Sequence, residues 1–384
     1  MKNKIVIGLG YGDEGKGVTT DALCRQVEKP LVVRFSGGHQ AGHTVVSPDG
    51  RRHVFSNFGA GTLAGAATFW SRNCTFNPVG FATERAVLVG LGVEPTYFVD
   101  PLAPVTTPYD VLYNRHLERG QRHGSCGLGF GATIARHEGP AKLHAMDLLY
   151  DFVLEKKLPA VAAYYAGLGV AFEEARLAHL LDDFHQRVLA LRSQQIRTCD
   201  LAQVLAENSF DQVIFEGSQG LLLDQEIGYF PHVTRAYVST RNALGMIRKY
   251  SLPDPEIYYV TRAYQTRHGN GPLTNEHLKP LLRKTPEETN VYNGWQGPQR
   301  RSLLDINQLR FALAADAAYS YGLPRHLVVT CLDQLSGPWL ATEDERRVGL
   351  DAARSLAARL GGEWQGVWEN RGVTSLLLDC LAKT

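Results

Sequence analysis

Acidic and basic side chains stand together inside a glycine-rich turn close to the start of the chain. The turn follows an apolar run, Ile5 to Ile7, and reads Gly-Leu-Gly-Tyr-Gly-Asp-Glu-Gly-Lys-Gly over residues 8–17. Glycines let the backbone turn sharply and expose N–H groups to an anion, and a helix that begins there adds favourable partial charge. Lys16 supplies a full positive charge. The turn therefore predicts a phosphate-binding loop, and a tight strand–helix turn without ligand is the less favoured alternative.

Two nucleotide-binding motifs fit the sequence of residues 8–17. Residues 10–16 have the G-x-x-x-x-G-K frame of a P-loop, although Gly17 stands where Ser or Thr would hold magnesium. Residues 10–15 also fit the dinucleotide fingerprint G-x-G-x-x-G, which expects an acidic residue about 20 residues further on. The next apolar run, 31–33, is followed instead by Arg-Phe-Ser. An NAD site is therefore disfavoured.

Two histidines lie in a second glycine-rich run, Gly-Gly-His-Gln-Ala-Gly-His-Thr over residues 37–44. The run comes just after an apolar stretch, at the place where open α/β sheets bind ligands. His39 and His43 could be metal ligands, but no carboxylate or third histidine nearby completes a set. We favour an active-site loop over a pair of structural histidines.

Other polar runs follow predicted strands. Residues 124–133 contain four glycines together with Ser125 and Cys126, and Arg136 lies beyond them. This run suits a second phosphate cradle, although taken alone it could equally be a disordered loop. Residues 216–220, Glu-Gly-Ser-Gln-Gly, come at the end of a predicted strand and are again placed for ligand contact.

The overall composition indicates a soluble enzyme. The chain has 384 residues, of which 44% are apolar and 21% are charged, and its net charge of +1 favours neither nucleic acid nor an anionic membrane. The six cysteines form no CxxC pair, as expected for reduced thiols. No apolar run is long enough to span a membrane, and the start lacks a signal-peptide pattern. We expect a cytoplasmic protein without nucleic-acid or membrane partners.

Strand-like and helix-like segments alternate along the chain. The pattern predicts strands at 5–7, 31–33, 211–215, 257–260 and 327–329, and helices at 82–91, 147–153 and 173–191. A Pro-Asp-Gly turn between 45 and 54 predicts a hairpin or a mobile flap, and we favour a solvated tip for Arg51 and Arg52 over a phosphate clamp. We therefore expect an α/β fold with a mostly parallel central sheet flanked by helices, a P-loop-like nucleotide-binding fold. No linker is evident, so residues 1–384 are expected to form a single domain with inserted loops and small subdomains.

Taken in order, these runs resemble adenylosuccinate synthetase, the family that joins IMP to aspartate with GTP hydrolysis. The resemblance covers most of the chain. It rests on five blocks in the family's order, at residues 12–17, 37–44, 215–220, 231–234 and 263–267.

The resemblance implies a mechanism. Asp13 would remove the N1 proton of the purine, and the activated O6 would attack the γ-phosphate. His43 would hydrogen-bond the transferring group, while Lys16 and Mg²⁺ neutralise its charge. An amine would then displace phosphate at C6. The magnesium ion would contact Asp13 and the backbone carbonyl of Gly42, which compensates for the missing Ser or Thr.

The resemblance also implies a set of binding residues and a homodimer. The implied nucleotide-binding residues are Gly12, Gly15, Gly17, Gly42, Thr44, Ser125, Cys126, Arg136, Gln219, Thr234 and Asp333. Arg136 would reach across the homodimer to the partner's nucleotide phosphate. Asp333 would read guanine, because a carboxylate that only accepts hydrogen bonds suits the N1–H and the exocyclic amine.

The run at 293–305 departs from the family's amine-binding signature of paired threonines followed by an arginine cluster. Arg300 and Arg301 remain. Together with Arg267 they could hold L-aspartate, or the site could take a different amine.

The triphosphate and the purine also have alternatives. Cys331 stands where the guanine-binding motif has lysine, and no Gly-Pro lies near the C-terminus, so the donor could be GTP or ATP. Shortened phage relatives that use GMP or dGMP lack the loop carboxylate. The presence of Asp13 therefore favours IMP over GMP or dGMP. A nucleotide-binding switch without ligase activity is disfavoured, because the runs around His43 and Gln219 would have no role in it.

Overall fold

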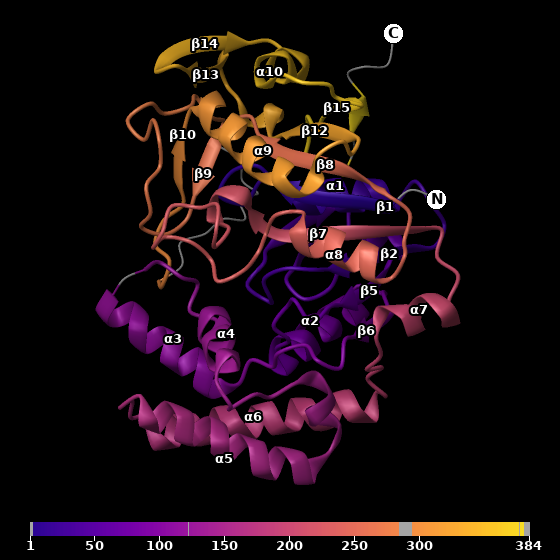
Figure 1. The fold of residues 1–384 in the computed structure, drawn as a ribbon, viewed down its shortest axis with the longest axis vertical. Coiled ribbons are helices and arrows are strands. Elements are labelled where there is room, and N and C mark those ends of the chain that lie inside the picture. The colour runs from indigo at the N-terminus through magenta and orange to yellow at the C-terminus, as the bar shows by residue number, and fades with distance from the viewer. Residues whose placement is uncertain (1–2, 122, 284–293, 376, 380–384) are drawn as a thin grey trace.

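A mostly parallel sheet runs through the centre of the described chain (Figure 1). The computed structural model describes residues 3–121, 123–283, 294–375 and 377–379; Asn293, the first residue of the 293–305 run, lies outside them. The strand order is β16-β15-β12-β8-β1-β7-β2-β5-β6, and only the β15–β16 pair within this sheet is antiparallel. The strands span β1 Asn3–Gly8, β2 Pro30–Arg34, β5 Ala67–Trp70, β6 Tyr97–Val99, β7 Gln212–Gly220, β8 Pro255–Arg262, β12 Arg325–Thr330, β15 Gly366–Glu369 and β16 Leu378–Asp379.

Helices cover both faces of this sheet. Alternate residues of a strand point to opposite faces, so Ile5 and Ile7 pack on one side and Val6 on the other. The first side is covered by α7 (Leu201–Glu207), α8 (Arg241–Lys249), α9 (Ile306–Ser320) and α10 (Ala353–Leu360), and the second by α1 (Lys16–Cys24). Burial on both faces explains why the strands are continuous apolar runs in the sequence. The predicted α/β fold with a mostly parallel sheet is confirmed.

A group of helices lies below the sheet in Figure 1. It contains α2 (Pro78–Gly90), α3 (Pro108–Gln121), α4 (Phe130–Glu138), the 3₁₀ helix η2 (Ala145–Leu149), α5 (Asp151–Gly167) and α6 (Glu174–Ser193). Of this group, α2, η2, α5 and α6 pack around a second apolar cluster. The helices predicted at 82–91 and 173–191 are confirmed. The one predicted at 147–153 is divided, because the Asp147 carboxylate accepts from the His144 N–H at 2.7 Å and caps a separate 3₁₀ turn.

Smaller elements complete the fold. They are the 3₁₀ helices η1 (Thr62–Ala64), η3 (Leu221–Leu223) and η4 (Leu332–Gln334), the predicted hairpin β3 (His43–Val46) and β4 (Arg52–Phe55), and strands β9 (Gln265–Arg267), β10 (Arg300–Ser302), β11 (Leu304–Asp305), β13 (Trp339–Glu343) and β14 (Arg346–Leu350). Among the described helices, none combines the length and the apolar character needed to cross a bilayer. The carboxyl ends of parallel β1, β2, β7, β8 and β12 meet at one edge, where such sheets bind ligands.

A buried ionic cluster ties α3, α4 and α5 together. The guanidinium of Arg136 pairs with the Asp110 carboxylate at 2.9 Å and donates to the Val105 carbonyl at 2.7 Å. The Tyr165 hydroxyl donates to the same carboxylate at 2.6 Å. Since Arg136 and Asp110 are both fully buried, each depends on the other for compensation of its charge.

We expect Asp110→Ala to lower the free energy of unfolding by about 3–5 kcal/mol, because it leaves the Arg136 charge buried without its partner. Tyr165→Phe removes one hydrogen bond from the same cluster and should cost only about 1 kcal/mol. Urea unfolding followed by circular dichroism measures both. Equal costs for the two variants would contradict the assignment of a buried ion pair.

Candidate active site

A cavity of about 530 Å³ opens where the carboxyl ends of the central strands meet. Most of the residues that the sequence singled out for catalysis and for triphosphate binding share its wall. It is lined by Asp13, Gly15, Lys16, Gly17, Gly42, His43, Thr44 and Asp333, together with Glu14, Arg52, Arg262, Arg301 and Cys331. Gly12 lines a much smaller neighbouring cavity.

Side chains of neighbouring strands hold the loop between β1 and α1 by donating hydrogen bonds to its backbone carbonyls. The carbonyl of Gly12 accepts from the Thr266 hydroxyl at 3.3 Å, and the carbonyl of Glu14 accepts from the Thr330 hydroxyl at 2.8 Å. The carbonyl between them, that of Asp13, accepts from Arg262. Three side chains from β9, β12 and β8 therefore fix three consecutive peptide units.

Glycine is required at two places in this loop. Gly15 has a φ of 91°, and a Cβ there would lie 2.6 Å from the Thr330 methyl. A Cβ on Gly17 would lie 2.7 Å from that of His43. The close approach of the His43 strand explains why Gly17 replaces the usual Ser or Thr of a P-loop.

Lys16 is buried beside the loop and is neutralised within it. Its ammonium lies 3.1 Å from the Glu14 carboxylate, which also accepts from the Gly10 N–H. The sequence had indicated no role for Glu14. Its position in the loop between Asp13 and Lys16 was the signal that could have identified it.

Asp13 lines the first cavity. Its Oδ2 atom accepts from His268 Nε2 at 2.9 Å and from Gln299 Nε2 at 3.0 Å. Burial alone would raise the pKa of Asp13, but the His268 hydrogen bond and the charges of Arg262 and Lys16 outweigh it and hold the pKa below its usual range. Asp13 is therefore a carboxylate at neutral pH.

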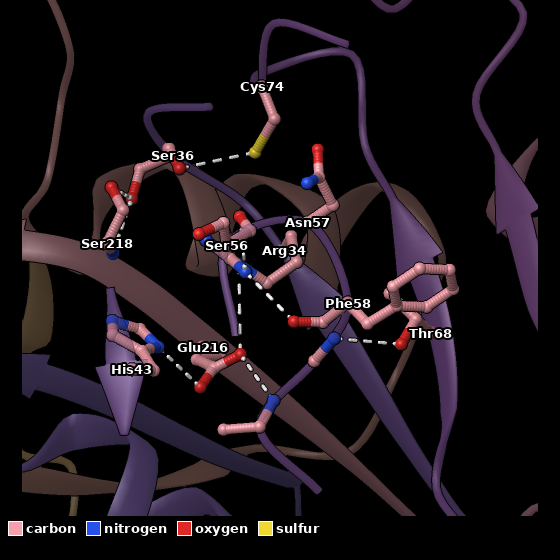
Figure 2. Close-up of polar contacts among 12 residues, drawn as sticks. Arg34, Ser36, His43, Ser56, Asn57, Phe58, Thr68, Cys74, Glu216 and Ser218 are labelled. Carbon is pink, nitrogen blue, oxygen red and sulfur yellow. Dashed lines mark hydrogen bonds and ion pairs between the residues drawn. The ribbon is translucent and has the colours of Figure 1, made fainter. Parts of the chain in front are cut away.

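His43 is oriented by a buried glutamate, as Figure 2 shows. Its Nδ1 lies 2.8 Å from Glu216, whose other oxygen accepts from the Ala60 N–H at 3.2 Å and lies 3.7 Å from Arg34 Nε. Within the described chain, His43 Nε2 has no hydrogen-bond partner. Burial lowers the pKa of His43, and Glu216 opposes that shift only in part. The pair fixes the imidazole by one nitrogen and leaves the other for a ligand.

A second cavity of about 490 Å³ adjoins the first through the Asp13–His268 contact. Its wall carries the residues expected to contact a purine nucleotide. It is lined by Ser125, Cys126, Gln219 and Thr234, by Arg267 from the set expected to bind the amine, and by Gln40, His123, His232, Arg235 and His268. The amide atoms of Gln40 are buried there without partners among the described residues. Gln40 and Arg235 had not been singled out as site residues.

Arg136 does not lie on either cavity in the described chain. Its guanidinium makes four hydrogen bonds inside the α3–α4–α5 cluster, and the side chain has no exposed surface. The expected contact with a partner's nucleotide phosphate conflicts with this placement, because the charge is already compensated by Asp110.

The three arginines expected to bind the amine are distributed over different surroundings. Arg267 lines the second cavity and Arg301 the first. The Arg300 guanidinium pairs with Glu276 at 3.0 Å and donates to the Gly269 carbonyl at 2.7 Å, and Arg300 lines neither cavity.

The hairpin tip differs in part from the sequence prediction. Arg51 pairs with Asp49 at 2.6 Å on the surface, as expected for a solvated tip. Arg52 instead lines the first cavity, so this residue is positioned for an anion.

Within the described residues, no group of three or more His, Cys, Asp or Glu side chains is close enough to hold a metal ion. His39 Nε2 contacts the Asn77 amide at 3.1 Å, and burial lowers its pKa to about 4. The two histidines of the 37–44 run therefore have separate partners, Asn77 and Glu216.

Comparison with known proteins gives one consistent family. The family model described as adenylosuccinate synthetase matches residues 5–338. The adenylosuccinate synthetase of Helicobacter pylori (strain G27) is 27% identical over 343 residues, covering 86% of this chain and 80% of the relative. That of Stenotrophomonas maltophilia (strain R551-3) is 28% identical over 342 residues, covering 87% and 77%.

Two solved structures share the fold. The fully ligated adenylosuccinate synthetase from Plasmodium falciparum superposes with a TM-score of 0.76 at 17% identity, over 98% of both chains. Cyanophage S-2L succinoaminodeoxyadenylate synthetase, bound to dGMP and to dATP as an energy donor, gives a TM-score of 0.62 at 16% identity, over 98% of this chain and 94% of that one. Because the family match spans most of the sequence, this chain belongs to the adenylosuccinate synthetase family and is a C–N ligase.

Proposed function

We propose that this enzyme phosphorylates the 6-oxygen of IMP with a nucleoside triphosphate and then replaces the phosphate with the amine of L-aspartate. The products are adenylosuccinate, nucleoside diphosphate and phosphate. One observation carries the proposal: Asp13 lies where two cavities adjoin, with Lys16 and His43 on one side and Gln219 on the other. A triphosphate in the first cavity and a purine nucleotide in the second would meet at this carboxylate.

The chemistry follows from the positions of the chain's own groups. The Asp13 carboxylate takes the N1 proton, and the electrons freed on the purine make O6 a nucleophile toward the γ-phosphorus. The bond from the γ-phosphorus to the β–γ bridging oxygen breaks, and its electrons leave with the diphosphate. In the second step the amine attacks C6, the bond from C6 to O6 breaks, and O6 departs within inorganic phosphate. The amine loses a proton as the new C–N bond forms.

His43 and Lys16 stabilise the charge of the phosphoryl group during transfer. His43 presents Nε2 because Glu216 holds Nδ1, and an anionic phosphoryl group opposite Nε2 would favour the protonated, donating form. Lys16 would exchange part of its contact with Glu14 for contact with the phosphates. Positioning and charge neutralisation of this kind provide most of the catalysis in phosphoryl transfer.

The donor set fits Mg²⁺ bound mainly through phosphates. The Asp13 side chain and the Gly42 backbone line the same cavity as Lys16, and they offer one carboxylate and one carbonyl oxygen. Mg²⁺ commonly takes one or two carboxylates and completes its shell with water and substrate phosphates. When bound, the ion would offset the negative charge of the triphosphate.

The second cavity supports binding of the purine nucleotide's phosphate by residues of the same chain, without an arginine from a partner subunit. Ser125, Cys126 and Thr234 share its wall with Arg235, which can supply the positive charge that buried Arg136 cannot. The homodimer implied by the resemblance and the cytoplasmic location expected from the composition stay predictions. Light scattering after size exclusion would test the first.

A second candidate keeps the same phosphoryl chemistry and changes the substrates. The cyanophage neighbour was solved with dGMP and dATP, and here the arginines expected to bind aspartate do not share one cavity. GMP or dGMP with ATP, or an amine other than aspartate, are therefore the alternatives. A panel of IMP, GMP and dGMP against amino acids, read by mass spectrometry with both triphosphates, separates them.

Transfer of ¹⁸O tests the reaction directly. IMP labelled at O6 should release labelled phosphate when triphosphate, Mg²⁺ and aspartate are present, because the C6–O6 bond breaks. Asp13→Asn should lose about 10²- to 10⁴-fold in turnover, the usual contribution of a general base. The exposed Asp182→Asn on α6 is the matched control and should keep full turnover. Unlabelled phosphate from the wild type, whichever amine is supplied, would exclude the proposed intermediate.

Asp333 should decide between GTP and ATP. Burial raises the pKa of Asp333, and the side chain lines the triphosphate cavity beside Cys331. If it accepts from guanine, Asp333→Asn places an amide donor against guanine donors and should lower kcat/KM for GTP by roughly 10- to 100-fold. The value for ATP should change little. A wild-type enzyme that prefers ATP, or a variant with unchanged preference, would argue against guanine recognition.

A further inference from the structure

The Asp13 carboxylate is held from one side by two residues outside the motifs that resemble the family. His268 Nε2 donates to Asp13 Oδ2 at 2.9 Å, and Gln299 Nε2 donates to the same oxygen at 3.0 Å. These side chains are at least partly shielded from solvent, and that of His268 is 19% exposed. Both hydrogen bonds end on Oδ2, so the two donors constrain the same carboxylate oxygen.

The two donors arrive together because of a short antiparallel ladder. Strands β9 and β10 pair with Arg267 opposite Arg300, and the same register places His268 opposite Gln299, one step beyond the ladder. The strand β9 also holds the loop itself through the Thr266 hydroxyl and the Gly12 carbonyl. One element therefore fixes both the backbone and the side chain of the catalytic loop.

The orientation of each donor is set by a further contact. The side-chain oxygen of Gln299 accepts from Arg301 Nε at 3.2 Å, so the amide must turn its NH₂ group toward Asp13. For His268 to donate through Nε2, its ring must carry a proton on that nitrogen. A carboxylate otherwise rotates broadly about its terminal torsion, and two donors on one oxygen restrict that rotation.

We propose that His268 and Gln299 are positioning residues, which hold the Asp13 carboxylate with one oxygen directed at the purine N1 proton. The inference rests on the proposed function, because it assigns Asp13 the role of base. The two residues stabilise the approach geometry and do not contact the transferring phosphoryl group. Loss of either donor frees the carboxylate to rotate away, which lowers kcat while nucleotide binding is retained.

The test compares His268→Val with His268→Gln in the labelled-phosphate assay, using IMP, GTP, Mg²⁺ and aspartate. Valine removes the donor, and we expect kcat to fall about 10- to 100-fold with KM for IMP changed less than about threefold, since small misplacements of a reacting group have effects of this size. Glutamine can place an amide N–H near the same oxygen and should recover most of kcat. Exposed His185→Gln on α6 is the control and should match the wild type.

Gln299→Leu removes the other donor to the same carboxylate, and it provides the test if His268→Val does not fold. We expect the same fall in kcat with an unchanged KM. Wild-type kcat in both donor-removing variants would overturn the inference. A rise in KM alone would also overturn it, because that result indicates a direct contact with the substrate. The same holds if His268→Gln is as slow as His268→Val, because that result indicates that His268 only fills space. Failure of the wild type to label phosphate would instead overturn the proposed function.

Discussion

The loop between β1 and α1 depends on the strands around it for its shape, and the reactive groups depend on the loop. Carbonyls of Gly12, Asp13 and Glu14 are fixed by side chains of β9, β8 and β12. The neighbouring β7 also passes so close that a Cβ on Gly220 would lie 2.2 Å from the Gly10 carbonyl oxygen. A loop confined in this way can hold a carboxylate and an ammonium at fixed positions.

The charges near this loop are buried in compensated pairs. Lys16 is paired with Glu14, and the Glu216 carboxylate that holds His43 lies 3.7 Å from Arg34 Nε. Buried charges that lose their partners are strongly destabilising, and pairs contribute little net stability compared with apolar packing. Their presence is better explained by function, because a dry and preorganised arrangement of charge strengthens interactions with a developing anion.

Sequence reasoning located most of the site because its residues lie in local motifs. The glycine-rich runs at 8–17 and 37–44 and the polar end of β7 each follow an apolar strand, and parallel strands bring their carboxyl ends together. The α/β fold was predictable for the same reason. Gly17 could be recognised as irregular from the sequence, but the reason for the glycine, the close approach of His43, arises only in the folded chain.

The remaining parts depend on contacts between residues far apart in the chain. His268 and Gln299 contact Asp13 although they lie about 250 and 290 residues further along the chain, and no local sequence pattern predicts these contacts. For Arg136 the local pattern was misleading, because its position after a glycine-rich run favoured a phosphate contact. Its counter-charge, Asp110, lies on another helix, so only the packing of α3 against α4 could reveal a structural role.

A structure with IMP and a non-hydrolysable triphosphate analogue would show whether the two nucleotides meet at Asp13. We expect the purine in the 490 Å³ cavity, with N1 within hydrogen-bond reach of Asp13 and O6 directed toward a γ-phosphate beside Lys16 and His43. A purine bound with its N1 edge turned away from Asp13, or a triphosphate whose γ-phosphate lies away from His43, would contradict it.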